Sequence, residues 1–137
     1  MKESLISKIE NDRASFAFEC ADKVDKDLKK TFKSHVKSFP MLIKTNGLGS
    51  AIAFLFSKKD SEKGVYETVG MCIVKWLNKD KHYETFGLSD FKNIKELAEK
   101  IINLDSTSYK ALTAEILSFF KWLRRFAEGL YKGDNND

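Results

Sequence analysis

The chain has 137 residues, with 24 basic side chains against 20 acidic ones, a net charge of +4 and 42% hydrophobic residues. This length predicts one domain with a core that needs no disulfide bonds, and the composition excludes a disordered or fibrous protein. Cys20 and Cys72 are too few and too far apart for a disulfide framework or a zinc finger, as is typical of a reducing compartment. The charged first residues do not form a secretory signal, and no window reaches the roughly 18 apolar residues of a membrane span. We therefore expect a cytoplasmic protein without membrane contact.

Helical periodicity dominates the first half of the chain. Over residues 5–21 the apolar positions recur mostly at steps of three and four, which predicts an amphipathic helix. A second helical segment is expected over residues 22–39, and Pro40 predicts a break because proline disfavours helical geometry in the preceding residue. Residues 46–50 (Asn-Gly-Leu-Gly-Ser) indicate a turn or a cap. The apolar run 51–56 favours a short buried helix, although the run by itself could be a strand.

The second half has the same character. Residues 65–77 predict another amphipathic helix, and residues 79–89 a polar loop. Asn93 and Glu96 have the spacing of a capping box at the start of the next helix, and Ser89 or Asp90 is the alternative cap. Over residues 109–130 the apolar positions alternate in steps of three and four, with further apolar residues beside them, which predicts a long helix packed into the core.

These elements predict an all-α fold. We expect a single compact bundle of about five to seven helices over residues 1–132, followed by a polar tail over residues 133–137. Trp122 projects away from the centre of the apolar stripe of the last helix. We favour a position at the edge of the core, and contact with a neighbouring subunit is the alternative because tryptophan is enriched at interfaces.

The residue types that most often carry catalysis or bind metals are few and scattered. His35 is expected on the apolar side of its helix and His82 in a loop, and neither belongs to a spaced metal motif. Cys20 and Cys72 fall on apolar faces, where a thiol behaves as a small inert hydrophobe. Residues 46–50 lack the lysine of a P-loop and the strand of a dinucleotide-binding motif. We therefore expect no enzyme, no metal and no cofactor; an enzyme that uses Cys20 or His35 is the weakest alternative.

Positive charge is concentrated in two segments. Residues 22–37 hold six lysines and three aspartates, and residues 106–132 hold five basic and two acidic residues, so each segment carries +3 and the rest of the chain −2. At about 100° per residue, the basic side chains of each segment fall on one face, away from the apolar stripe. Such rows suit contact with a phosphate backbone without reading its sequence. The candidate RNA-binding residues are Lys26, Lys30, Lys33 and Lys37 in the first segment and Lys121, Arg124 and Arg125 in the second.

A solvated helix face is the alternative explanation for either basic row. Glu128 supports this alternative because it can pair with Arg124 or Lys132 at i,i+4 spacing. Whether the two rows lie on a common surface depends on how the helices pack, which the pattern of residues does not determine.

Several motifs resemble a known family in their order and spacing. They are Arg13-Ala14 and Ala17, Pro40-x-x-Ile43, Asn46-Gly47-Leu48 followed by residues 51–55 (Ala-Ile-Ala-Phe-Leu), and Tyr109, Thr113, Glu115 and the run from Trp122 to Glu128. Together they resemble the small α-helical subunit of the Cmr complex, the type III-B CRISPR RNA-guided effector. The resemblance covers nearly the whole chain. Arg124 replaces a lysine of the family pattern and keeps its charge, and Gly129 replaces an alanine near the helix end.

The resemblance implies a non-catalytic, all-helical subunit that acts in antiviral defence. Several copies would stack beside the backbone subunits and help to form a basic groove for the duplex of guide RNA and single-stranded target RNA. Cleavage of the target would belong to the backbone subunit. The basic rows would then contact phosphates, because base pairing with the guide supplies the specificity. The expected partners are the other Cmr subunits, including the large subunit, together with these RNAs; the alternative is a helical adaptor that binds only protein.

Overall fold

The computed structural model describes residues 2–79 and 90–132, with the side chains of residues 2–7 excepted, and within these ranges the chain is helical and contains no strand. The α-helices are α1 (Lys2–Asp22), α2 (Lys29–Asn46), α3 (Leu48–Ser57), α4 (Val65–Asn78), α5 (Ile94–Ile101) and α6 (Ser106–Leu130), and the short 3-10 helices η1 (Lys26–Leu28) and η2 (Glu62–Gly64) precede α2 and α4. The prediction of an all-α bundle is confirmed. The expected polar loop falls mostly, and the expected polar tail entirely, outside the described residues.

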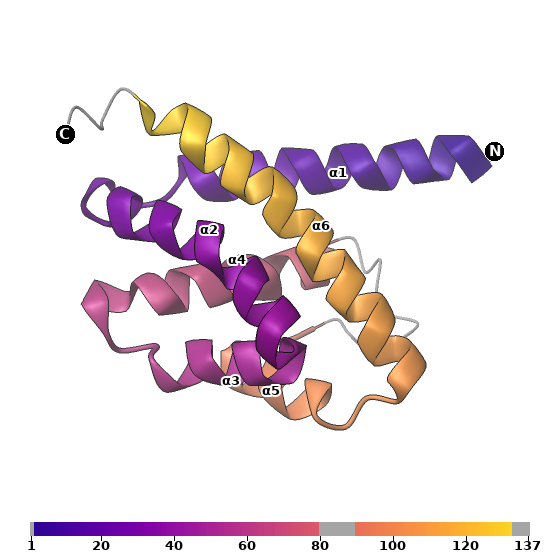
Figure 1. The fold of residues 1–137 in the computed structure, drawn as a ribbon. Helices are drawn as coiled ribbons and strands as arrows, with labels where there is room; N and C mark the ends of the chain where they lie inside the picture. The colour runs from indigo at the N-terminus through magenta and orange to yellow at the C-terminus, as the bar shows by residue number, and fades with distance from the viewer. Residues whose placement is uncertain (1, 80–89, 133–137) are drawn as a thin grey trace.

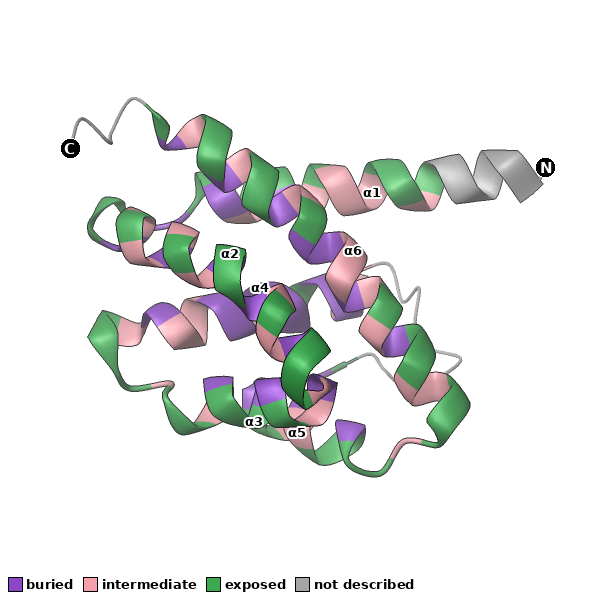
Figure 2. Ribbon diagram, in the orientation of Figure 1, coloured by how far each residue is buried: buried purple, intermediate pink, exposed green. Residues whose placement is uncertain are grey.

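The helices form two groups that share one core. The long helix α6 crosses α1 and packs along α2, while α3, α4 and α5 pack together beneath them (Figure 1). Buried residues follow the inner sides of the helices (Figure 2). The largest fully buried side chains include Trp76, Phe32, Phe119 and Phe120, and no polar or charged residue in the described ranges is fully buried. None of the described helices is both long enough and apolar enough to cross a bilayer.

Pro40 lies inside α2, so the expected helix break is wrong. Proline removes one backbone hydrogen bond, but Phe39 and Ile43 on either side of it are buried in the core. The Phe39 ring lies 5.0 Å from the Phe120 ring of α6. The burial of this continuous apolar stripe outweighs the local preference of one residue. The helix instead ends before Gly47, where a φ of 90° favours a residue without a Cβ atom.

The other helices that the sequence predicts agree better with the structure. The apolar run 51–56 lies in α3, and residues 65–77 lie in α4, as predicted. Asn93 caps α5: its Oδ1 accepts a hydrogen bond from the backbone N–H of Glu96 at 3.0 Å. The Glu96 carboxylate in turn accepts from the backbone N–H of Lys92 at 2.9 Å. The capping-box spacing therefore predicted the start of α5 correctly.

One polar cluster joins three helices at the edge of the core. Arg13 of α1 donates two hydrogen bonds to Glu115 of α6, at 2.7 Å from Nε and 2.8 Å from Nη2. The indole N–H of Trp76, on α4, donates to the same carboxylate at 3.0 Å. The Arg13 and Glu115 side chains are each only 11% exposed. A bidentate charged pair with little water around it is among the stronger side-chain contacts, so this cluster fixes α1 and α4 against α6.

Replacing the shared acceptor tests this cluster. Glu115→Ala removes the carboxylate that accepts from both a guanidinium and an indole N–H at the edge of the core, and we expect a loss of about 3 kcal/mol in the free energy of unfolding, although Arg13 keeps its ion pair with Glu10. Urea denaturation followed by circular dichroism measures the loss. Glu99→Ala, on the exposed side of α5, is the matched control and is expected to change the stability by less than about 0.5 kcal/mol. Equal effects of the two substitutions would contradict the role of the cluster.

Gly70 allows α4 and α5 to approach closely. A Cβ atom at this position would lie 2.3 Å from Cδ1 and 2.7 Å from Cγ1 of Ile94, a side chain that is itself buried. We expect Gly70→Ala to destabilise the fold by about 1–3 kcal/mol because the core must expand to accept the methyl group. A Cβ atom at Gly129 meets nothing within 4 Å. Gly129→Ala is therefore expected to leave the melting temperature unchanged or to raise it, since alanine favours the helix.

Candidate nucleic-acid interface

A groove of about 510 Å³ lies between α2 and α6. The two helices run roughly antiparallel and pack against one another (Figure 1). Pro40 and Lys44 of α2 line one side of the groove, and residues of α6 line the other. The residues from α6 are Leu117, Phe120, Lys121, Arg124, Arg125 and Glu128. Phe120 is fully buried, so the base of the groove is apolar while its edges are charged.

The charges that line the groove are mostly positive. Four cationic side chains, Lys44, Lys121, Arg124 and Arg125, face one carboxylate, that of Glu128. Arg124 Nε lies 3.7 Å from Glu128 Oε1, with both side chains nearly half exposed. An ion pair with this exposure is weak, so Glu128 offsets little of the attraction for an anion. A concave surface with this balance of charge concentrates anions in its neighbourhood.

Lys33 and Lys37 extend the same basic surface along α2. Together with Pro40 and Lys44 they are spaced by four, three and four residues, which places all four on one face of the helix. Lys37 is exposed and Lys33 is half-buried. The structure therefore places three of the seven candidate residues, Lys121, Arg124 and Arg125, in the lining of the groove, and Lys33 and Lys37 on the α2 face that carries Pro40 and Lys44.

Neither Lys26 nor Lys30 is among the residues that line this groove. Lys26 belongs to η1, where it sits between Asp25 and Asp27 and lines a separate hollow with Lys63. The continuous helix expected over residues 22–39 is interrupted between α1 and α2, so the helical projection does not apply to Lys26. Lys30 is exposed and precedes Lys37 by seven residues, so it lies on the same face of α2 but nearer the start of the helix.

Lys44 is the groove residue that sequence reasoning missed. The predicted row of lysines ends at Lys37 because the sequence predicts a helix break at Pro40. In the continuous helix α2, Lys44 follows Lys37 by seven residues, or about two turns, and returns to the same face. The signal that could have found it is the apolar stripe, which continues past the proline to the buried Ile43.

His35 takes part in a structural contact away from the groove. Its Nε2 lies 3.1 Å from Glu62 Oε2, and its ring lies 4.4 Å from the Tyr66 ring of α4. Hydrogen bonds from Tyr66 and from His35 lower the pKa of the Glu62 carboxyl. No group of three or more metal-ligating side chains occurs among the described side chains of residues 8–79 and 90–132. The other histidine, His82, lies outside the described residues.

Trp122 packs within the chain at the edge of the core, as favoured above. Its indole N–H donates to Glu10 Oε1 of α1 at 3.1 Å. Its ring stacks on Phe126 at 5.8 Å between centroids, and Phe126 in turn meets Phe18 edge-on at 5.3 Å. These contacts add to the packing of α1 on α6.

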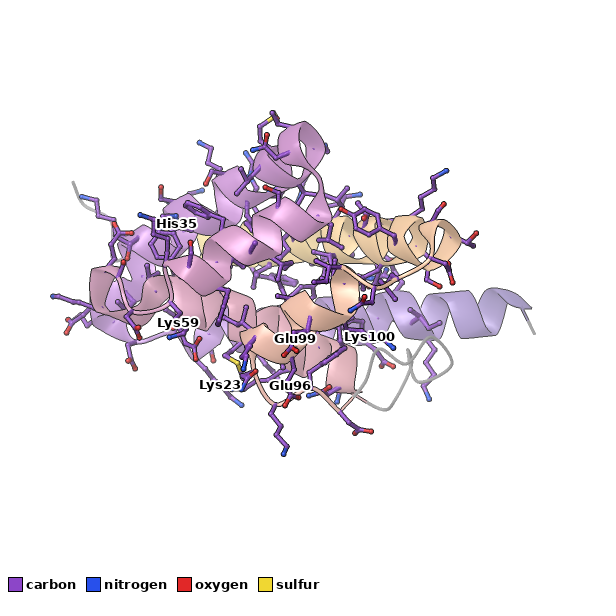
Figure 3. The ribbon with its side chains drawn as sticks, turned by 90° about the horizontal axis from the view of Figure 1, so that it is seen from below. Lys23, His35, Lys59, Glu96, Glu99 and Lys100 are labelled. Carbon is purple, nitrogen blue, oxygen red and sulfur yellow. The ribbon has the colours of Figure 1, made fainter. Side chains whose placement is uncertain are left out.

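The underside of the molecule carries mixed charges. Viewed from below, Glu96, Glu99 and Lys100 of α5 lie close together, and Lys59 is seen nearer α4 (Figure 3). Lys59 Nζ pairs with Asp60 Oδ2 at 3.2 Å. Alternating signs suit a solvated surface better than one that binds a polyanion.

The fold and the groove define a small all-α protein with a basic groove between two of its helices. The sequence pattern of the family described as CRISPR-associated protein (Cas_Cmr5) matches residues 9–130, and the chain belongs to this family. It is 25% identical over 99 residues to the CRISPR system Cmr subunit Cmr5 of Thermus thermophilus, across 72% of this chain and 74% of that protein.

The likeness extends to three dimensions. The crystal structure of a CRISPR-associated Cmr5 family protein from Thermus thermophilus has a TM-score of 0.67 to this chain at 25% identity. The match covers 88% of this chain and 96% of that one. The resemblance to the small Cmr subunit, based on the order of short motifs, is therefore confirmed.

Proposed function

We propose that this protein is a non-catalytic structural subunit of a type III-B CRISPR (Cmr) effector and that it contacts RNA through the α2–α6 groove. The observation that carries the proposal is the convergence of two basic helix faces on one groove in a member of this family. The relative from Thermus thermophilus is described as a Cmr subunit, which supports assembly with other Cmr subunits.

The chemistry of the groove supports contact with phosphates rather than with base edges. Lysine and arginine side chains displace the cations condensed on a nucleic acid, which gives affinity without sequence preference. Arg124 and Arg125 add planar guanidinium groups that can bind phosphate with two hydrogen bonds or stack on an unpaired base. In an effector of this kind the guide RNA selects the target by base pairing, so the subunit itself does not need to recognise the base sequence.

The groove is poorly suited to acid–base or nucleophilic chemistry. Among the described residues that line it, Glu128 is the only carboxylate, and there is no histidine or cysteine. This supports a structural role for the subunit, with RNA cleavage carried out elsewhere in the complex. We propose that the protein acts in the cytoplasm in antiviral defence, with copies that stack on one another beside the backbone subunits.

A protein-only adaptor is the second candidate, and an apolar groove between α2, α3 and α4 favours it. This groove has a volume of about 470 Å³ and includes Met41 and Phe54, which are 65% and 39% exposed. Exposed apolar side chains around a hollow are typical of protein contacts. Retention of the purified protein on single-stranded RNA at low salt, lost at high salt, would favour RNA contact over this alternative.

Charge reversal in the groove tests the RNA proposal. In the Lys121→Glu, Arg125→Glu double variant we expect the affinity for a labelled single-stranded RNA to fall roughly tenfold, because two phosphate contacts become repulsive. The slope of log Kd against log salt should also flatten, by about 0.7 for each lost contact. Fluorescence anisotropy over a salt series measures both quantities.

The matched control makes the same change in charge on another face. Lys92 and Lys95 are exposed at the start of α5, where glutamates are tolerated because they favour a helix N-terminus. The Lys92→Glu, Lys95→Glu variant should bind RNA within about twofold of the unmodified protein, since its change acts only through the screened overall charge. Equal losses of RNA affinity in the two variants, or no loss in either, would contradict the proposal that the groove binds RNA. Failure of the unmodified protein to co-purify with the other Cmr subunits would contradict the assignment as a subunit.

A further inference from the structure

The two cysteines lie together at the contact between α1 and α4. Cys20 and Cys72 are 52 positions apart in the sequence, but both line a hollow of about 410 Å³ between these helices. Each thiol is close enough to the other to shift its pKa. Both are free thiols: Cys72 is buried, 6% exposed, whereas Cys20 is only partly covered.

The surroundings make the two thiols chemically different. Lys23 of the α1–η1 connection and Lys75 of α4 line the same hollow, and Figure 3 shows Lys23 on the underside of the molecule. The hydrogen bond from Cys72 lowers the pKa of the Cys20 thiol, and the charges of Lys75 and Lys23 add to this effect against the opposing effects of burial and Glu19. The same hydrogen bond and burial raise the pKa of the Cys72 thiol. A partly exposed thiol in positive surroundings is the arrangement found in cysteines that react with oxidants.

We propose that Cys20 is an oxidation site for peroxides and that Cys72 resolves the product into an intramolecular disulfide that links α1 to α4. The hollow gives a small oxidant such as hydrogen peroxide access to the Cys20 sulfur. Cys72 lines the same hollow but is only 6% exposed, so the oxidant reaches it less readily than Cys20.

The reaction balances with hydrogen peroxide as the two-electron oxidant. The Cys20 thiolate attacks one peroxide oxygen, the O–O bond breaks, and the leaving hydroxide takes a proton to become water. The Cys20 sulfenic acid that remains is then attacked by the Cys72 sulfur, the S–O bond breaks, and a second water leaves with the Cys72 proton. Two thiols and one peroxide thus give one disulfide and two waters. A dithiol reductant reverses the change.

The disulfide would have two consequences for the fold. It closes a loop of about 50 residues, and a cross-link that closes a loop of this length strongly restricts the conformations of the unfolded chain. It also protects Cys20 from irreversible oxidation to the sulfinic or sulfonic acid. In a reducing compartment the two cysteines stay as thiols, and the disulfide forms only when peroxide is present.

Mass spectrometry of the intact full-length protein tests the proposal. After treatment with a small excess of hydrogen peroxide, we expect a monomer that is about 2 Da lighter, with no thiol that titrates under denaturing conditions. The melting temperature should rise by roughly 5 °C or more, and dithiothreitol should restore both thiols and the original value. Two titratable thiols after treatment, or covalent dimers in place of the lighter monomer, would overturn the proposal.

Single variants separate the roles of the two cysteines. Cys72→Ser should leave Cys20 to accumulate oxygen, as mass increases of about 16 or 32 Da. Cys20→Ser should leave Cys72 unmodified in the folded protein, because Cys72 is shielded. Oxidation of Cys72 in the folded Cys20→Ser variant at the rate seen for the unmodified protein would overturn the assigned order. Circular dichroism checks that each variant is folded, and the result for the unmodified protein tests the disulfide independently of the variants.

Discussion

The hydrogen-bonded ion pair between Arg13 and Glu115 determines how the two ends of the chain meet. These residues are 102 positions apart, and Trp76 from the middle of the chain donates to the same carboxylate. The cluster fixes the direction in which α6 crosses α1 and α4. The aromatic stack of Trp76 on Phe119, with rings 5.7 Å apart and nearly parallel, continues this contact into the core. Because the position of α6 is set in this way, the cluster also sets where its basic face lies.

The groove follows from the packing of α2 on α6. Phe39 and Phe120 meet between the two helices, and their burial leaves the flanking polar residues on either side of a shared hollow. At the far end, Lys29 Nζ of α2 lies 5.4 Å from the centroid of the Tyr131 ring, and the Tyr131 hydroxyl donates to the Ala21 carbonyl at 2.6 Å. These contacts hold the chain just beyond α6 close to the start of α2 and the end of α1. The arrangement that buries the core therefore also places the basic rows beside one another.

Local pattern predicts much of the fold. The three-and-four spacing over residues 109–130 indicates α6, because a stripe of that period can be buried only by a helix. The capping pair at Asn93 indicates the start of α5, since its hydrogen bonds involve only neighbouring residues. The seven candidate basic residues rest on the same principle. Three of them line the groove, and Lys30, Lys33 and Lys37 lie on the face of α2 that leads to it.

The remaining features depend on contacts between distant residues. Pro40 is a local signal for a break, but the core contacts of Phe39 and Ile43 outweigh it, and Lys44 was missed for this reason. The pairing of Arg13 with Glu115 leaves no periodic signal, and neither does the proximity of Cys20 to Cys72. The break in helical register between α1 and α2 removes Lys26 from the row in which its spacing places it. Each of these features is set by how helices dock rather than by their individual sequences.

The central claim is that the α2–α6 groove is the surface that meets RNA in the assembled effector. Reconstitution with the other Cmr subunits and a guide RNA, followed by ultraviolet crosslinking and peptide mapping, tests it most directly. The account predicts crosslinks to peptides that contain Lys37, Lys44 and Lys121–Arg125. Crosslinks confined to α5 and the face around Lys59, with none on α2 or α6, would contradict it.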